Sequence, residues 1–344
     1  MRSEGQHDAM GGGATSPASA ERTMQAIVQG TYGSADVLRL ARIARPEIAD
    51  DEVLVRVHAA GLDRGTWHLM TGLPYLARLA FGVRRPKNPV PGVDVAGTVV
   101  AVGSSVTRFA TGDEVFGFGT GSFAEYAVAR EDKLARKPVN ASFEQAAVIP
   151  VSAATALQSL CDVGRVEQGQ NVLIIGASGG VGSYAVQLAK ALGAELTGVC
   201  STPKLDLVRS LGADHVIDYT RDDFADGPER YDLILDIGGN SALSRLRRAL
   251  TPTGTVVIVG GEGGGNVTGM SRQLWALALS PFVRQRLTMF IAKQRSNDLE
   301  RLTDLVEAVK VTPSIDRTYP LNQAPEAMRH LEAGKARGKV AITI

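Results

Sequence analysis

The stretch that decides the fold is Asn171-Val-Leu-Ile-Ile-Gly-Ala-Ser-Gly-Gly-Val-Gly182. A short apolar strand runs directly into a glycine-rich turn, and a helical pattern follows over residues 183–192. Glycines permit a tight turn whose backbone N–H groups can approach a pyrophosphate, and the following helix N-terminus adds partial positive charge. Ala177 replaces the first glycine of the usual G-x-G-x-x-G pattern. The position between a strand and a helix still predicts a dinucleotide site.

Further strand-length apolar segments surround this turn. They lie at residues 195–200, 215–218, 231–236 and 255–259, and helical stretches separate them. Near-continuous apolar strands between helices are typical of a parallel sheet that is covered on both faces. We therefore predict a doubly wound α/β domain over residues 148–288.

The sequence on either side of this domain has a different pattern of apolar and polar residues. Alternating strands are expected at residues 25–28, 52–58 and 97–102, with turn residues between them. A helical segment at residues 298–309 and a closing strand at 339–344 resemble this first part more than the centre. The prediction is a β-rich domain built from residues 24–147 and 289–344, with the doubly wound domain inserted.

Composition limits the possible partners and compartment. Residues 1–23 are rich in glycine, serine and alanine without the apolar core of a signal peptide, so we expect a disordered tail. The formal net charge is +1 over 344 residues, and no basic stripe is interleaved with aromatic residues. Nucleic acid and membranes are therefore not expected partners. Only two cysteines are present, Cys161 and Cys200, which fits a reducing cytoplasm.

The choice of cofactor depends on the end of the strand at residues 195–200. NAD sites place an acidic residue there to bind the ribose hydroxyls, but this chain has Cys200-Ser-Thr-Pro-Lys204. A carboxylate would repel a 2′-phosphate, whereas Ser201 can donate a hydrogen bond to it and Lys204 can neutralise it. Tyr219, at the end of the following strand, could cover the adenine or reach the phosphate. These residues predict NADPH.

Several motifs in order resemble a known family. They are Pro91-Gly-Val-Asp-Val-Ala-Gly97, Thr111-Gly-Asp-Glu-Val115, Ala153-Ala-Thr-Ala156 and Arg209-Ser-Leu-Gly-Ala-Asp214, together with the glycine-rich turn. This pattern is similar to the medium-chain dehydrogenase/reductase superfamily, and within it to the zinc-free quinone oxidoreductase branch that includes zeta-crystallin. The resemblance implies a GroES-like catalytic domain, an inserted Rossmann domain, and a cleft between them that holds the nicotinamide.

The resemblance also implies cofactor contacts at particular positions. They are Thr155, Ser178, Gly179, Gly180, Val181, Ser201, Lys204 and Tyr219, with Gly238, Gly260, Arg337, Gly338 and Lys339 toward the nicotinamide end. Relatives of this kind often form homodimers through an edge strand of the nucleotide domain, which residues 255–259 and 286–291 could provide here.

The zinc ligands of related alcohol dehydrogenases are missing. Their three positions resemble Asp63, Val93 and Val151 in this chain, and the cysteine-rich structural zinc lobe is absent. Catalytic zinc needs three protein ligands, so one carboxylate is not enough to hold it. No metal is expected.

Without a metal, conjugated carbonyl compounds are the most accessible hydride acceptors. Conjugation spreads the incoming charge of a quinone or an α,β-unsaturated carbonyl, so hydrogen-bond donors in a dry cleft can be sufficient. Candidate polar groups are Asp63, Thr66, His68 and Tyr75, all in an expected loop at residues 61–75. Tyr75 is the preferred proton donor and Asp63 an orienting residue, although Tyr75 packing on the cleft rim is an equal alternative. The competing functions are alcohol or aldehyde dehydrogenation and non-catalytic NADPH binding in a redox sensor.

Overall fold

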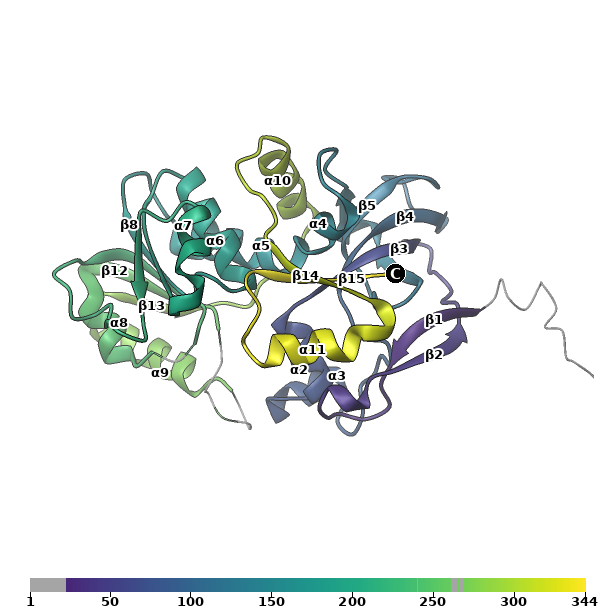
Figure 1. The fold of residues 1–344 in the computed structure, drawn as a ribbon, viewed down its shortest axis with the longest axis horizontal. Coiled ribbons are helices and arrows are strands. Elements are labelled where there is room, and N and C mark those ends of the chain that lie inside the picture. Colours follow the sequence, from purple (N-terminus) through teal and green to yellow (C-terminus); the bar gives the residue numbers. More distant parts are fainter. Residues whose placement is uncertain (1–22, 240, 261–264, 266–268) are drawn as a thin grey trace, which may run out of the picture.

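The computed structural model describes residues 23–239, 241–260, 265 and 269–344. Two main sheets stand side by side with helices around them (Figure 1). The predicted tail at residues 1–23 lies outside the described residues except for Thr23, which begins the first strand. Among the described helices, none is long and apolar enough to cross a membrane.

The inserted domain contains a six-stranded parallel sheet. Its strands are β8 (Asn171–Ile175), β9 (Glu195–Cys200), β10 (His215–Asp218), β11 (Tyr231–Asp236), β12 (Leu250–Ile258) and β13 (Arg286–Met289). Their order across the sheet is β10-β9-β8-β11-β12-β13. This is the 3-2-1-4-5-6 order of doubly wound dinucleotide-binding folds, in which ligands bind where the order reverses, at the carboxyl ends of the strands. Here that point lies between β8 and β11.

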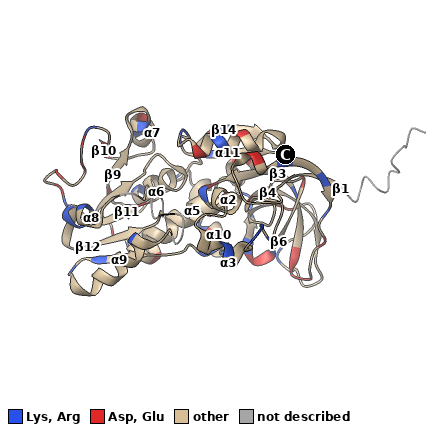
Figure 2. Ribbon diagram, turned by 90° about the horizontal axis from the view of Figure 1, so that it is seen from below, with Lys and Arg blue, Asp and Glu red and all other residues tan. Residues whose placement is uncertain are grey.

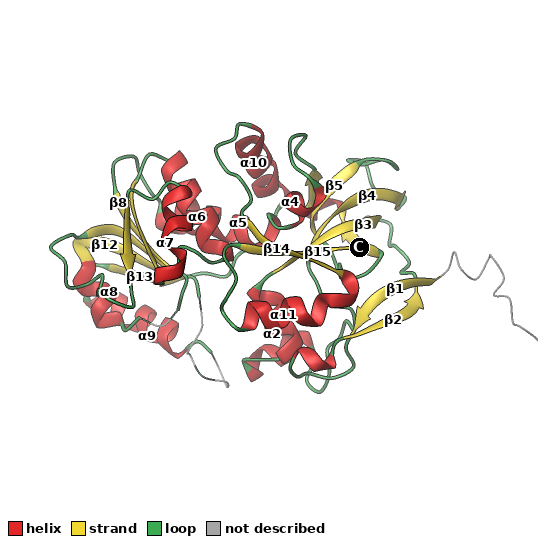
Figure 3. Ribbon diagram, in the orientation of Figure 1, coloured by secondary structure: helices red, strands yellow, loops and turns green. Residues whose placement is uncertain are grey.

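Helices cover both faces of this sheet, as predicted. The side chains of β8 alternate between two cores: Val172 and Ile174 join one, and Leu173 and Ile175 join the other. The first core includes residues from α5 (Pro150–Gln158) and α6 (Gly180–Ala191), with α7 (Leu205–Ser210) beside them. The second includes residues from α8 (Leu243–Ala249) and α9 (Ser271–Leu279). Figure 3 shows the two groups of helices on opposite sides of the strands. Burial on both faces explains the near-continuous apolar strands.

The second sheet joins the two ends of the chain. Its order is β14-β15-β3-β4-β5-β7, with β6 also paired to β3. The strands are β3 (Glu52–Leu62), β4 (Asp94–Val102), β5 (Glu114–Phe118), β6 (Tyr126–Arg130), β7 (Leu134–Arg136), β14 (Ile315–Pro320) and β15 (Lys339–Thr343). Strand β15 pairs antiparallel with β3, placing Val340 opposite Leu62. The closing strand therefore completes a β-rich domain that begins before the inserted one, as expected, while β1 (Thr23–Val28) and β2 (Arg39–Ala44) form a separate hairpin.

The expected loop at residues 61–75 is wrong, because most of this segment is helical. Strand β3 continues to Leu62, and α2 (Arg64–Thr71) follows at once. The Asp63 side chain caps this helix by accepting a hydrogen bond from the Thr66 backbone N–H at 2.8 Å. Gly72 ends it in the left-handed conformation, with φ of 64°. A short 3-10 turn, η2 (Tyr75–Ala77), and α3 (Arg78–Phe81) come next.

The other helices support the junction between the two sheets. They are α4 (Phe143–Ala147), α10 (Ser296–Glu307) and α11 (Ala324–Glu332), and a π-helical turn (Ser159–Gly164) extends α5. Gln158 of α5 contacts α10, because its Nε2 donates a hydrogen bond to Asp298 Oδ2 at 2.7 Å. The predicted boundary between residues 288 and 289 lies inside β13, one residue before its end.

Candidate active site

A cavity of about 480 Å³ lies at the junction of the two sheets. Its wall combines the glycine-rich turn, the start of α2, the α5 helix and the segment that leads into β15. The lining residues are Leu62, Asp63, Arg64, Gly65, His68, Val151, Ser152, Thr155, Gly176, Ser178, Gly179, Gly180, Val181, Lys204, Ile237, Gly238, Val259, Gly260, Leu331, Gly334, Ala336, Gly338 and Lys339. The cavity therefore opens at the carboxyl ends of β8 and β11, where a doubly wound fold binds its ligand.

The glycine-rich turn is a close-packed backbone cradle. Gly176 has a φ of 88°, which favours glycine. A Cβ atom on Gly182 would lie 2.1 Å from the Gly176 carbonyl oxygen, so only glycine fits there. Helix α6 begins at Gly180 without a side-chain cap, and Gly180 and Val181 line the cavity. Uncapped N–H groups at a helix N-terminus are suited to bind phosphate, so the turn fits the pyrophosphate of a dinucleotide.

The alanine in the turn is explained by its neighbour on β9. Ala177 is fully buried, and a Cβ atom on Gly198 would lie 3.1 Å from the Ala177 Cβ. The absence of a side chain at Gly198 therefore leaves room for the methyl group that replaces the usual first glycine. The departure from the G-x-G-x-x-G pattern is accommodated in the core and does not alter the cavity side of the turn.

Lys204 reaches from the dinucleotide-binding sheet to the segment before β15. Its Nζ donates hydrogen bonds to the carbonyl oxygens of Gly334 at 2.8 Å and Ala336 at 2.7 Å. Burial lowers the pKa of Lys204, while the nearby carboxylate of Asp316 acts in the opposite direction. Lys204 thus lines the cavity, and its ammonium group is bound to two neutral acceptors that do not cancel its charge.

The structure brings ten of the thirteen predicted cofactor residues to the cavity. They are Thr155, Ser178, Gly179, Gly180, Val181, Lys204, Gly238, Gly260, Gly338 and Lys339. Ser201, Tyr219 and Arg337 are not among the lining residues. Tyr219 is 63% exposed at the end of β10, and its backbone N–H donates to the Cys200 carbonyl, so it stands beside Ser201 at the edge of the sheet. Contacts between the cofactor and any of the thirteen residues remain predictions, and the geometry supports ten of them.

A buried polar cluster in the wall of the cavity brings together residues that are far apart in the sequence. Lys339 is 1% exposed, and its Nζ donates to Ser152 Oγ at 2.9 Å and lies 3.6 Å from Asp94 Oδ2. The Asp94 Oδ1 atom accepts a hydrogen bond from the Val151 backbone N–H at 2.9 Å. A Cβ atom on Gly180 would lie 3.1 Å from Lys339 Cδ, so the cluster abuts the start of α6. It joins β4, α5 and β15 directly under the phosphate turn.

Asp94 has an unusual environment for a carboxyl group. Complete burial raises its pKa to about 8, the Asp63 carboxylate acts in the same direction, and Lys339 opposes the rise. The Tyr184 hydroxyl is also close enough to sense the charge of Asp94, and burial raises the tyrosine pKa well above its ordinary value. Asp94 therefore retains a proton near neutral pH far more readily than an exposed aspartate does.

Of the polar residues predicted to take part in catalysis, Asp63 and His68 line the cavity and Tyr75 does not. Asp63 lines the cavity, with Oδ1 bound to Thr66 and Oδ2 buried without a hydrogen-bond partner among the described residues. His68 also lines it, and its Nδ1 lies 2.8 Å from the Leu73 carbonyl oxygen. Tyr75 is 50% exposed on η2, stacks against Arg78, and is not a lining residue. Its role as proton donor remains a prediction.

Two of the three positions that resemble the zinc ligands of related alcohol dehydrogenases carry apolar side chains here. Val151 lines the cavity and Val93 packs against the central core, which leaves Asp63 alone. Within the described residues, no group of three histidine, cysteine or acidic side chains is arranged to hold a metal. Both cysteines remain protonated thiols at neutral pH, because burial raises the pKa of Cys161 and brings that of Cys200 to about 11.

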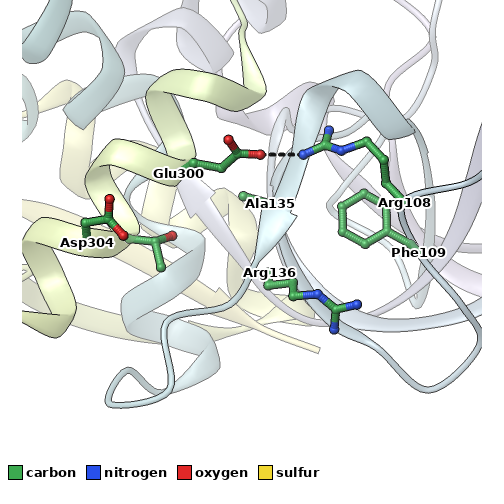
Figure 4. Close-up of a pocket in the computed structure, with 7 residues that line it drawn as sticks. Arg108, Phe109, Ala135, Arg136, Glu300 and Asp304 are labelled. Carbon is green, nitrogen blue, oxygen red and sulfur yellow. Dashed lines mark hydrogen bonds and ion pairs between the residues drawn. The ribbon is translucent and has the colours of Figure 1, made fainter.

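A second, smaller pocket lies between α10 and β7, away from the turn (Figure 4). Its volume is about 370 Å³. Two of its lining residues pair with each other, Arg108 with Glu300 at 2.5 Å, and Arg136 pairs with Asp113 outside the lining at 3.0 Å. The ion pair from Arg108 fastens α10 to the β-rich domain. This pocket offers no phosphate cradle, so the cavity at the turn is the candidate site.

Comparisons with known proteins agree with this geometry. Residues 49–139 match the alcohol dehydrogenase GroES-like domain, and residues 211–342 match the zinc-binding dehydrogenase family. The chain is 35% identical to an NADPH-dependent alkenal/one oxidoreductase of Arabidopsis thaliana, over 95% of this chain and 81% of that protein. It is 33% identical to a quinone-oxidoreductase homologue of Spinacia oleracea, covering 94% and 99% of the two chains. The structure of the quinone oxidoreductase from Coxiella burnetii superposes with a TM-score of 0.84 at 28% identity, covering 94% and 99%.

Proposed function

The chain belongs to the medium-chain dehydrogenase/reductase superfamily, in its quinone oxidoreductase branch, and from that membership we propose that it reduces quinones or α,β-unsaturated carbonyl compounds with NADPH and without zinc. The observation that carries the proposal is the cavity itself. It joins the glycine-rich turn, a phosphate cradle, to a wall in which the aliphatic side chain of Val151 stands at one of the three zinc-ligand positions, while Val93 at a second position packs against the core.

NADPH fits the residues present. The uncapped start of α6 would receive the pyrophosphate, and the ammonium group of Lys204 supplies positive charge for a 2′-phosphate. Thr155, Gly238 and Gly260 also line the cavity, and the nicotinamide would be held beside them. Bound NADPH supplies a hydride, and the protein positions the acceptor and protects the site from water.

The protein must also stabilise the charge that develops on the acceptor. Asp63 is placed to orient polar groups because its carboxylate fixes the first turn of α2, which forms one wall of the cavity. Val151 keeps the wall apolar, and conjugation in the substrate spreads the charge, so hydrogen-bond donors suffice in place of a Lewis acid.

An acceptor panel tests this function. The purified full chain should consume NADPH with 1,2- and 1,4-quinones and with alkenals, but not with short saturated aldehydes, and it should not oxidise ethanol. Activity confined to short aldehydes and alcohols would favour the alternative dehydrogenase function. Tight NADPH binding without turnover on any acceptor would favour a redox sensor.

We also propose that the protein is a cytoplasmic homodimer. Strand β13 stands at an edge of the six-stranded sheet, whereas β12 lies inside it. The adjacent α9 exposes Leu274, Trp275 and Leu277, and Phe282 beyond it is 85% exposed. An apolar surface beside an open edge fits a second copy of the chain. Light scattering should show a dimer that Trp275→Glu dissociates and Leu40→Glu does not; a wild-type monomer would contradict this proposal.

Two unpaired thiols fit a reducing compartment, which cell fractionation would test.

A further inference from the structure

The hydroxyl group of Ser152 has a proton that the surrounding protein does not use. Ser152 is 1% exposed and lines the cavity, and its Oγ accepts the hydrogen bond from Lys339 Nζ at 2.9 Å. A lysine ammonium group can only donate, so this bond leaves the serine proton free. Within the described part of the chain, no acceptor for that proton is found. Buried donors rarely remain unpaired, so the arrangement calls for an acceptor inside the cavity.

Neighbouring hydroxyl groups on the same helix differ in this respect. The Thr155 hydroxyl donates to the Val151 carbonyl oxygen at 2.6 Å, and the Ser159 hydroxyl donates to the Ala156 carbonyl oxygen at 2.8 Å. Each of these protons is already bound to the helix backbone. Among the three, only Ser152 has both an unbound hydroxyl proton and a neighbouring ammonium group, that of Lys339, which can replace this proton.

We propose that Ser152 donates the proton that completes reduction of the substrate, and that Lys339, held by Asp94, resupplies it. This inference rests on the proposed function, because it assigns the acceptor as the carbonyl oxygen of an enone or quinone. Asp94 and Lys339 act as positioning and supply residues, and Ser152 is the group that would touch the substrate.

The proton and electron balance is complete for an enone. When the substrate accepts a hydride at its β-carbon, the electron pair of its carbon–carbon double bond shifts and negative charge develops on the carbonyl oxygen. The Ser152 O–H bond breaks as an O–H bond forms on that oxygen, and an N–H bond of Lys339 breaks to restore the serine. The released enol converts to the saturated ketone in water. The cluster then regains one proton from solvent, so one proton is consumed in each cycle.

The position of the cluster suits this role. Asp94 is completely buried and Lys339 nearly so, which keeps solvent from competing for the proton during the reaction. Asp94 Oδ2 lies 3.6 Å from Lys339 Nζ, close enough to attract the ammonium group and hold it against Ser152. Because Lys339 belongs to β15 and Ser152 to α5, the path exists only when the two domains are joined.

Kinetics test the transfer step. General acid catalysis contributes about 10²–10⁴-fold, so Ser152→Ala should lower kcat for enone reduction by about 10²-fold or more while leaving the NADPH dissociation constant unchanged. Ser152→Thr, which keeps a hydroxyl, should restore most of the rate. Ser159→Ala is the matched control and should behave as wild type. An unchanged kcat in Ser152→Ala together with a large loss in Tyr75→Phe would overturn the proposal in favour of the tyrosine.

A binding measurement decides the inference independently of turnover. The probe is 4-nitrophenol, whose phenolate resembles the charged oxygen and absorbs differently from the neutral phenol, added to full-length protein saturated with NADP⁺. Wild type and Ser159→Ala should bind the phenolate, and Ser152→Ala should bind it about tenfold more weakly or worse, since hydrogen bonds to charged groups are among the stronger ones. Equal binding by Ser152→Ala would refute the donor role. The proposed function would instead be refuted if the wild-type protein failed to oxidise NADPH with every enone and quinone tested.

Discussion

The side chain of Lys204 crosses from the dinucleotide-binding domain to donate a hydrogen bond to the Ala336 carbonyl oxygen at 2.7 Å. Lys204 lines the cavity, and its side chain is partly withdrawn from solvent. One cation therefore links the two domains at the place where we expect the adenosine phosphate, so its charge should affect cofactor choice more than folding.

Replacing this cation should change the preferred cofactor. Lys204→Glu should lower kcat/KM for NADPH about tenfold to hundredfold relative to NADH, because a carboxylate repels the 2′-phosphate and a charge-assisted hydrogen bond is lost. Steady-state kinetics with both cofactors measure the ratio. Lys310→Glu, an exposed charge reversal after α10, is the control and should leave the ratio unchanged. An unaltered preference in Lys204→Glu would show that the phosphate binds elsewhere.

The backbone cradle should not tolerate a side chain at Gly182. The Gly182→Ala methyl group would lie 2.1 Å from the Gly176 carbonyl oxygen, so the turn must shift away from the geometry that receives phosphate. We expect a stability loss of about 1–3 kcal/mol and a large loss of NADPH affinity. Urea unfolding and fluorescence titration measure the two effects. The control is Gly30→Ala, which should change neither stability nor NADPH affinity because a Cβ atom at Gly30 meets no atom within 4 Å. Normal NADPH affinity in Gly182→Ala would contradict the assignment of the turn as the phosphate cradle.

Burial of Asp94 should make stability depend on pH. Its pKa is about 8 in the folded protein against an ordinary value of 3.8, so between these values the folded state holds a proton that the unfolded state has released. The stabilising contribution is therefore fully present below about pH 4 and is lost as the pH rises toward about 8. Asp94→Asn should remove this part of the slope. Urea unfolding of both proteins at about pH 5 and about pH 8.5 tests it, and identical slopes would mean that Asp94 is ionised throughout.

The sequence predicted the elements whose signal is local. The strand, turn and helix around residues 171–192 appear where expected, because alternating burial of Val172 and Leu173 and the spacing of the glycines are properties of adjacent residues. Helix α2 was missed, although Asp63 and Thr66 form a capping pair of the kind that starts a helix. The capping pair is thus a local signal for this helix, in the segment where a loop is expected.

The contacts that define the site beneath the turn join residues that are far apart in the sequence. Asp94, Ser152 and Lys339 are far apart in sequence, and each looks like an isolated polar residue until β15 pairs with β3 and α5 packs against α6. The carbonyl acceptors of Lys204 at Gly334 and Ala336 likewise depend on how the two domains meet. No local spacing encodes such contacts, which explains why Ser152 is not among the proton-donor candidates that the sequence offers.

The most direct test of the account is the rate of NADPH oxidation by chelator-treated protein of measured zinc content, with a conjugated enone or quinone as acceptor. The account predicts a rate equal to that of untreated protein at a zinc content far below one atom per chain, because Val93 and Val151 provide no ligands. A rate that falls with the zinc removed, and returns when zinc is added back, would contradict it.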